Sequence, residues 1–234
     1  SGPFDSRSFR LGNQILGNPE SAAGLEMTLN GPTLRFLTDS RIVLTGAEMT
    51  AQLDGTELPF WSVINVEKGQ ELVIGKIKEA GARAYLLVQG GIQCPDYLDA
   101  KATFTLGQFG GHAGRALRTG DILHLCTLDR GRETASNLVP AELLPEIGKQ
   151  WELHVIPGPQ GAPDFFSAEY VETFFDHDWE VHYNSSRTGV RLIGPKPQWV
   201  RSDGGEAGMH PSNIHDNAYA FGTVDFTGDM PVIL

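Results

Sequence analysis

The residues between 41 and 92 carry a repeat of period two, and no other feature of this chain constrains its fold so strongly. Apolar and β-branched side chains alternate or run together in RIVLTGAEMT, AQLDGTELPF, SVINVEKGQELVIGKI and ARAYLLVQGGI, which is a pattern typical of strands. The dipeptides Asp54-Gly55 and Lys68-Gly69 fall between these runs, where tight turns belong. The pattern predicts an antiparallel β region.

Two other segments have the repeat of a helix, with a capping residue at the start. They are residues 5–17 and residues 165–179, and Gly17 can supply the left-handed turn that ends the first helix. The predicted N-caps are Asp5 and Ser167, and the predicted buried faces hold Phe9, Ile15 and Leu16 in the first helix and Val171, Phe174 and Phe175 in the second.

Glycine recurs throughout residues 105–121, TLGQFGGHAGRALRTGD, which we name the glycine-rich segment. We expect a loop there, followed by a strand at 122–128. The segment has no lysine followed by Ser or Thr, so it is not a phosphate-binding loop. Gly110 and Gly111 could let backbone amides meet a ligand, with Arg115 free to hold a carboxylate. A glycine-rich turn with a surface arginine is an equal alternative.

The polar residues 129–150 include two prolines and precede an apparent strand at 151–159. They predict a linker or excursion between a first β-rich lobe at 1–128 and a second lobe at 151–234. The predicted fold class is mainly β with a few helices. The apolar residues 232–234 end the chain as a strand for which the sequence offers no partner, so we expect a fragment truncated at its C-terminus.

Composition argues against two kinds of partner. The formal net charge is −11 and the basic residues are scattered, whereas binding to nucleic acid needs clustered Lys and Arg. No apolar run approaches the roughly 20 residues that span a bilayer, and the first ten residues lack the order of a signal peptide. We expect a cytoplasmic protein with no membrane partner.

Hydrogen-bonding side chains crowd the C-terminal part of the chain and are typical of a site for a small polar molecule. Turn caps are an equal alternative for several of them. The spacing in HPSNIHD matches no metal signature, so we expect no metal, and no Gly-x-Ser-x-Gly elbow is present. The crowded residues are Glu206, His210, Ser212, Asn213, Asp216, Asn217 and Tyr219.

Several motifs resemble, in order and interval, the biotin-dependent carboxyltransferase family called allophanate hydrolase subunit 2. They are SGPFDSRSFRLGNQILGNPESAAGLEMTLNGPTLRF, LTGAEMTAQLDG, YLLVQGGI, FGGHAGRALRTGD, VIPGPQ and TGVRLIGPKPQW. Within that family the last stretch, SDGGEAGMHPSNIHDNAYAFGTVDFTGDMPVIL, is most similar to the carboxyltransferase domain of urea carboxylases. The family's usual first strand and its glycine-rich ending are absent.

This resemblance implies a cyclophilin-like β-barrel that is part of a larger carboxyltransferase domain. It also implies transfer of the carboxyl group from carboxybiotin to urea, which gives allophanate. The Met-Lys-Met biotin-attachment motif and an ATP-grasp pattern are missing, so biotin must come on a separate carrier domain, while a separate biotin carboxylase domain uses ATP, Mg²⁺ and bicarbonate. A subunit 1-like half completes the implied set of partners, and we expect the segment alone to be inactive.

The resemblance also assigns roles to residues. The substrate-holding, catalytic set is Asn213, His210, Asp216 and Glu206, and the further residues that we expect to bind urea, a related amide or amidine, or biotin are Gly110, Gly111, Arg115, Gln160, Asn184, Arg191, Ser212 and Tyr219. Two alternatives stay open at this point. One is a guanidine carboxylase, and the other is a 5-oxoprolinase subunit or a non-catalytic regulatory module of the same family.

Overall fold

The computed structural model describes residues 2–126, 138–201, 204–215 and 218–234. The chain divides into two compact units, Ser1–Trp151 and Glu152–Leu234. In the described ranges no helix has the length and apolar character that a membrane crossing requires.

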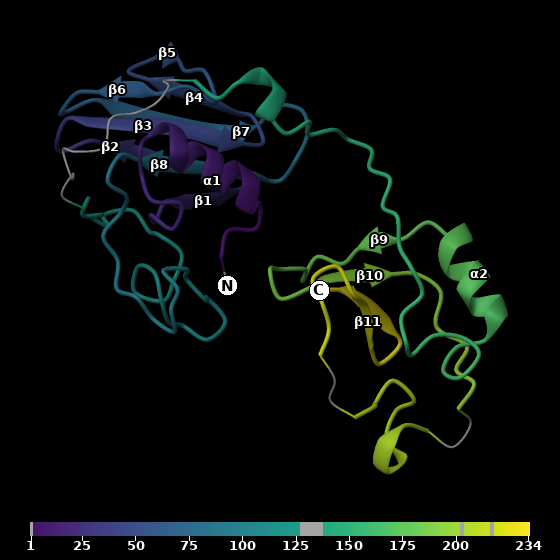
Figure 1. Ribbon diagram of the computed structural model, residues 1–234. Coiled ribbons are helices and arrows are strands. Elements are labelled where there is room, and N and C mark those ends of the chain that lie inside the picture. The colour runs from purple at the N-terminus through teal and green to yellow at the C-terminus, as the bar shows by residue number, and fades with distance from the viewer. Residues whose placement is uncertain (1, 127–137, 202–203, 216–217) are drawn as a thin grey trace. The chain divides into compact units, whose positions relative to one another are not determined.

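The first unit contains two four-stranded antiparallel sheets, which lie in the purple-to-blue part of Figure 1. One sheet has the order β1-β8-β3-β6, with β1 at Leu25–Thr28, β3 at Ser40–Gly46, β6 at Ile64–Val66 and β8 at Arg83–Val88. The other has the order β2-β7-β4-β5, with β2 at Thr33–Arg35, β4 at Met49–Leu53, β5 at Thr56–Glu57 and β7 at Glu71–Ile77.

The predicted turn between β4 and β5 is confirmed. Asp54 and Gly55 have φ angles of 47° and 84°, and positive values at both central residues are what the tight hairpin turn requires. Asp and Gly adopt this conformation at low cost, which is why the dipeptide marks the turn in the sequence.

Apolar side chains from both sheets meet in one core. In β4 buried and exposed residues alternate, because successive side chains of a strand point to opposite faces. The buried members of this core are Met27, Ile42, Leu44, Met49, Ala51, Leu53, Val66, Leu72, Ile74, Ala84, Leu86 and Val88. The apolar residues that recur with period two in the sequence are therefore the residues that point into this core.

Backbone pairing continues from the first sheet into the second at one corner. Asn30 forms bridges with Thr28 at the end of β1 and with Lys76 in β7, and the Gly31 N–H donates to the Gly75 carbonyl at 2.9 Å. Such a corner is how a β-barrel turns one sheet into the next. The mainly β fold class is confirmed.

Helix α1 (Ser6–Ile15) packs against β3 and β8, as Figure 1 shows. The predicted N-cap is confirmed, because the Asp5 carboxylate accepts a hydrogen bond from the Ser8 amide at 3.0 Å. Gly17 has a φ of 70° and ends the helix. A second apolar cluster lies under α1 and contains Ile15, Leu16, Val43, Tyr85, Leu87 and Val139, with Phe9 packed against it.

The segment after β8 is less regular than the sequence predicts. Residues 122–126 contain one isolated bridge, between Leu125 and Ile92, so the predicted strand is wrong there, and residues 127–128 lie outside the described ranges. Of the predicted join at 129–150, residues 129–137 also lie outside those ranges. Val139 is buried and donates its amide to the Trp61 carbonyl at 3.2 Å, and a short 3-10 helix, η1 (Ala141–Leu143), follows.

The second unit contains one antiparallel sheet in the order β11-β12-β10-β9. Its elements are α2 (Ala168–Asp176), β9 (Glu180–Val181), β10 (Val190–Ile193), the 3-10 helix η2 (Glu206–Gly208), β11 (Val224–Thr227) and β12 (Met230–Ile233). The prediction that the last strand lacks partners is wrong, because Val232 of β12 lies between Asp225 of β11 and Arg191 of β10. Residues 151–157 form no strand, which corrects the prediction for 151–159.

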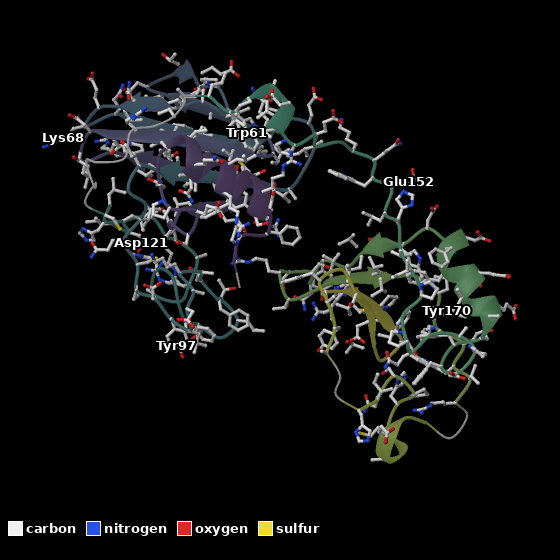
Figure 2. All side chains as sticks on the ribbon, viewed as in Figure 1. Trp61, Lys68, Tyr97, Asp121, Glu152 and Tyr170 are labelled. Atoms are coloured by element: carbon white, nitrogen blue, oxygen red, sulfur yellow. The ribbon has the colours of Figure 1, made fainter. Side chains whose placement is uncertain are left out.

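Aromatic side chains form the core of the second unit. Tyr170 of α2, labelled in Figure 2, has 3% of its surface exposed and packs against Phe166 and Phe226. Ser167 caps the helix as predicted, accepting from the Tyr170 amide at 3.1 Å. The predicted buried face is wrong for Phe175, which is 62% exposed.

Candidate functional site

An ion pair organises the glycine-rich segment of the first unit. The Arg115 guanidinium donates two hydrogen bonds to the Asp121 carboxylate, at 2.7 and 2.8 Å, and the Arg118 amide donates a third at 2.7 Å. Arg115, followed by the Arg118 amide, holds the pKa of Asp121 well below its usual range. Figure 2 labels Asp121 and Tyr97 in this part of the first unit.

Gly110 and Gly111 are explained by close packing of the backbone. A Cβ atom at Gly110 would meet the Ala102 carbonyl oxygen, and one at Gly111 would meet the Thr103 hydroxyl. Both residues also have positive φ angles, 73° and 50°, a conformation that costs glycine least. Close packing and backbone conformation therefore explain why glycine occupies these two positions, without a bound ligand.

A shallow cavity of about 430 Å³ lies beside the ion pair. It is lined by Thr105, Gln108, Ala113, Gly114, Arg115, Ala116 and Arg118. Because Arg115 already binds Asp121 through two hydrogen bonds, an external carboxylate would have to compete with that pair.

In the second unit, residues 204–213 fold into a compact loop that we name the polar loop. The Gly205 amide donates to the Met209 carbonyl at 2.8 Å, the Glu206 amide to the Asn213 carbonyl at 2.9 Å, and the Asn213 amide to the His210 carbonyl at 2.8 Å. A Cβ atom at Gly205 would meet the His210 and Asn213 carbonyl oxygens. This position therefore requires glycine, and the tight loop places the Glu206 and Asn213 backbones side by side.

The imidazole of His210 connects the polar loop to the β11–β12 turn. Its Nδ1 lies 2.9 Å from the Ser212 hydroxyl and accepts from the Ser212 amide at 3.2 Å. Its Nε2 lies 3.2 Å from Oδ1 of Asp229. The Ser212 hydroxyl in turn accepts from the Gly228 amide at 3.1 Å.

Asp229 lies against three nitrogen-bearing side chains from separate parts of the second unit. Besides His210, the Trp199 indole N–H donates to Oδ1 at 3.1 Å, and the Lys196 ammonium lies 3.3 Å from Oδ2. The Trp199 hydrogen bond, followed by Lys196 and His210, holds the pKa of this carboxyl below its usual value. The Trp199 ring also meets the His210 ring edge-on, with 5.6 Å between centroids.

The structure brings together four of the predicted site residues, Glu206, His210, Ser212 and Asn213. Asp216 lies outside the described residues. Asn184 and Arg191 pair with each other across the β9–β10 turn, where the guanidinium donates to the Asn184 carbonyl at 2.8 Å. Gln160 is half-buried in a separate turn, Tyr219 is exposed, and Gly110, Gly111 and Arg115 belong to the first unit.

Sequence reasoning missed Asp229, Trp199 and Lys196 as members of this cluster. The only signal was local: Gly228-Asp229 marked a turn, and that turn is confirmed between Thr227 and Met230.

Within the ranges that the structure describes, no group of three His, Cys, Asp or Glu side chains could hold a metal ion.

The polar loop offers groups suited to a small molecule with N–H and carbonyl groups. The Asn213 amide can both donate and accept, and the Glu206 carboxylate can accept two N–H groups. The Asn213 side chain donates to the Met209 thioether sulfur at 3.2 Å, a weak acceptor that a ligand oxygen can replace.

Comparison with known proteins gives the family. The model named carboxyltransferase domain, subdomain A and B, matches residues 1–234. Urea amidolyase of Saccharomyces cerevisiae is 48% identical over all of this chain, and a 5-oxoprolinase subunit of Haemophilus influenzae is 30% identical over the same extent. The crystal structure of Kluyveromyces lactis urea carboxylase is 45% identical and superposes over the whole chain with a TM-score of 0.90.

This chain therefore belongs to the carboxyltransferase family with subdomains A and B, which confirms the predicted kinship. Over its whole length it is similar to one segment of the Kluyveromyces lactis urea carboxylase. The chain spans 13% of the yeast urea amidolyase, 21% of the Kluyveromyces lactis urea carboxylase and 70% of the bacterial 5-oxoprolinase subunit.

Proposed function

We propose that this chain is the carboxyltransferase part of a biotin-dependent urea carboxylase that converts urea to allophanate. The observation that carries this proposal is the similarity along the whole chain, at 48% and 45% identity, to proteins named urea amidolyase and urea carboxylase. The 5-oxoprolinase subunit is less similar, at 30% identity. This difference favours a urea carboxylase over a 5-oxoprolinase subunit.

Biotin, when bound in its carboxylated form, would supply the carboxyl group that a urea nitrogen takes in exchange for one of its protons. A separate carrier domain delivers biotin, and a separate biotin carboxylase domain uses ATP, Mg²⁺ and bicarbonate to load it. A subunit 1-like half completes the carboxyltransferase, and the enzyme works in the cytoplasm.

The polar loop holds the substrate in this proposal. Urea presents two NH2 donors and one carbonyl acceptor, so its site needs oxygen acceptors and at least one N–H donor. Asn213 supplies one of each, and Glu206, joined to it by a backbone hydrogen bond of 2.9 Å, adds a carboxylate. The ureido ring of biotin carries the same kinds of donor and acceptor, so this set of groups suits it as well.

Fixing the substrate is the main contribution that these residues make. Holding two reactants at near-attack distance removes about 7–11 kcal/mol from a barrier in well-oriented systems. A donor that meets the developing negative oxygen contributes a few kcal/mol more. The Asn213 amide N–H is the donor that we assign to this task.

The substitution Asn213→Ala in the full-length enzyme tests the assignment. We expect urea-dependent ATP turnover to be lost, while ATP cleavage that depends on biotin alone continues, because the biotin carboxylase domain is untouched. The matched control is Glu172→Ala, on the exposed side of α2 in the same unit, which should keep both activities. Unchanged urea-dependent turnover by the Asn213 variant contradicts the assignment.

Guanidine is the substrate to compare with urea. The guanidinium ion replaces the carbonyl oxygen with a third nitrogen and carries a charge, so an extra carboxylate facing the site would favour it. The proposal predicts a higher kcat/KM for urea. A higher kcat/KM for guanidine would make this chain part of a guanidine carboxylase.

A further inference from the structure

We propose that Asp229 is a positioning residue that fixes the orientation of the His210 imidazole and so holds the polar loop in its binding geometry. This inference has two halves. The structural half is that Asp229 orients the His210 ring. The functional half is that this orientation supports urea turnover, and it alone rests on the proposed substrate role of Asn213. The residues involved come from three places, namely the Trp199 region, the polar loop and the β11–β12 turn.

The direction of each hydrogen bond follows from groups that can only donate. The backbone amides of Gly228 and Ser212 are donors, so the Ser212 hydroxyl accepts from the first and His210 Nδ1 accepts from the second. A nitrogen that accepts carries no proton in the neutral ring, so the proton is on Nε2. Nε2 then faces Oδ1 of Asp229, 3.2 Å away.

The Ser212 hydroxyl completes the chain of hydrogen bonds. Its oxygen accepts from the Gly228 amide and lies 2.9 Å from His210 Nδ1, so the hydroxyl and the Ser212 amide share the single lone pair of that nitrogen. The order is thus Gly228 amide to Ser212 hydroxyl to His210 to Asp229. Both ends lie in the β11–β12 turn, so Ser212 and the imidazole together attach the polar loop to the sheet at two points.

This arrangement separates the roles of His210 and Asn213. Both ring nitrogens of His210 are engaged inside the network, so the imidazole acts through its neighbours rather than as a proton carrier for the substrate. Asn213 follows Ser212 directly, and its amide donates to the His210 carbonyl at 2.8 Å. Movement of the His210 ring would therefore displace the side chain that we assign to the substrate.

Asp229 is itself held by groups outside the loop. The Trp199 indole shares Oδ1 with His210, Lys196 binds Oδ2, and the Trp199 ring packs edge-on against the His210 ring. Such outer partners fix the orientation of a functional group, and displacements of about 1 Å can cost about 100-fold in rate. Asp229 is thus the residue whose loss should release the ring.

The ring tautomer is read directly by ¹⁵N NMR of the 1–234 chain, with the His210 signals assigned by a His210→Gln variant. We expect the wild-type ring to show the Nε2-protonated tautomer at pH 8, and Asp229→Ala to shift the Nε2 signal, because that nitrogen loses the carboxylate beside it. The matched control is Asp225→Ala, in the same hairpin, which should leave the wild-type spectrum. A His210 spectrum in Asp229→Ala identical to that of the wild type overturns the positioning role.

Kinetics of the full-length enzyme test the functional half. Asp229→Ala should lower urea-dependent kcat/KM by about 10- to 100-fold and leave biotin-dependent ATP cleavage without urea unchanged. Asp229→Asn, which keeps an acceptor oxygen for His210 and Trp199, should recover most of the loss. The double variant with His210→Ala should be no worse than the poorer single variant, because the two residues act as one unit.

The two kinds of readout separate the possible failures. If the wild-type enzyme does not carboxylate urea, the proposed function is wrong, and the NMR experiment still decides whether Asp229 fixes the ring. If urea turnover is normal in both Asp229→Ala and His210→Ala, the functional half of this inference is wrong while the proposed function stands.

Discussion

The packing of α1 against the first sheet makes Gly12 a sensitive position. Gly12 lies inside α1 (Ser6–Ile15) and is buried. A Cβ atom built there would meet Cδ1 of Leu87 and would lie 2.8 Å from Cγ2 of Thr45 and 3.3 Å from Cγ1 of Val43. All three neighbours have no exposed surface, so the space that an added methyl group needs must come from the core itself.

Two effects of Gly12→Ala oppose each other. Alanine in place of glycine inside a helix stabilises it by about 0.5–1 kcal/mol. Extra volume in a well-packed core costs about 1–3 kcal/mol, because side chains and backbone must shift. Since the methyl group meets three buried side chains, packing should win, and we predict a net loss of about 1–2 kcal/mol in the free energy of unfolding.

Thermal unfolding followed by calorimetry measures this loss. A change of 1 kcal/mol shifts the midpoint by about 2–4 °C for a chain of this size, so Gly12→Ala should unfold about 2–8 °C lower. Gln14→Ala is the matched control, since Gln14 is exposed in the same helix and its variant should stay within about 1 °C of the wild type. An equal or higher midpoint for Gly12→Ala would refute the packing argument.

Two further predictions concern the first unit. The pKa of Asp121 is lowered first by Arg115 and then by the Arg118 amide, so the stability that the pair contributes is present above the ordinary aspartate pKa of about 3.9 and is lost as pH falls through the lower folded value. The NMR shift of the Arg118 amide should therefore hold constant down to about pH 4, and a midpoint above that pH would contradict the ion pair. Tyr85→Phe removes a buried hydroxyl that accepts from the Asp5 amide at 2.7 Å, which should cost about 1–3 kcal/mol of unfolding free energy. A calorimetric midpoint equal to that of the wild type would show that the hydroxyl does not support the helix cap.

Elements with strong local signals were predictable from the sequence. Asp5 and Ser167 cap their helices as expected, because a cap depends on residues within one turn. The β4–β5 hairpin follows from Asp54-Gly55 for the same reason. In each case neighbouring residues alone determine the conformation.

The wrong predictions are those in which distant residues decide. β12 has one partner beside it in the chain, β11 across the Gly228-Asp229 turn, but its second partner, β10, lies about 40 residues earlier. Residues 122–126 have the apolar pattern of a strand, yet only Leu125 finds a bridging partner. Phe175 has the helical spacing of a buried residue, but the aromatic core of the second unit forms around Tyr170.

The residues of the candidate site also fall into those that the local sequence could predict and those that only the fold brings together. His210, Ser212 and Asn213 stand close together in the sequence, so their clustering was visible there. Asp229 and Trp199 join them only through the folding of the second unit. The family resemblance named the chemistry, whereas the arrangement of the imidazole between the polar loop and the β11–β12 turn required the structure.

Product identification tests the central claim most directly. The full-length enzyme should be given ¹³C-bicarbonate, ATP and urea, and the product analysed by ¹³C NMR and mass spectrometry. The account predicts label in the carboxyl carbon of allophanate with the wild-type enzyme and none with Asn213→Ala. Absence of labelled allophanate from the wild-type enzyme, with labelled carboxyguanidine formed when guanidine replaces urea, would contradict it.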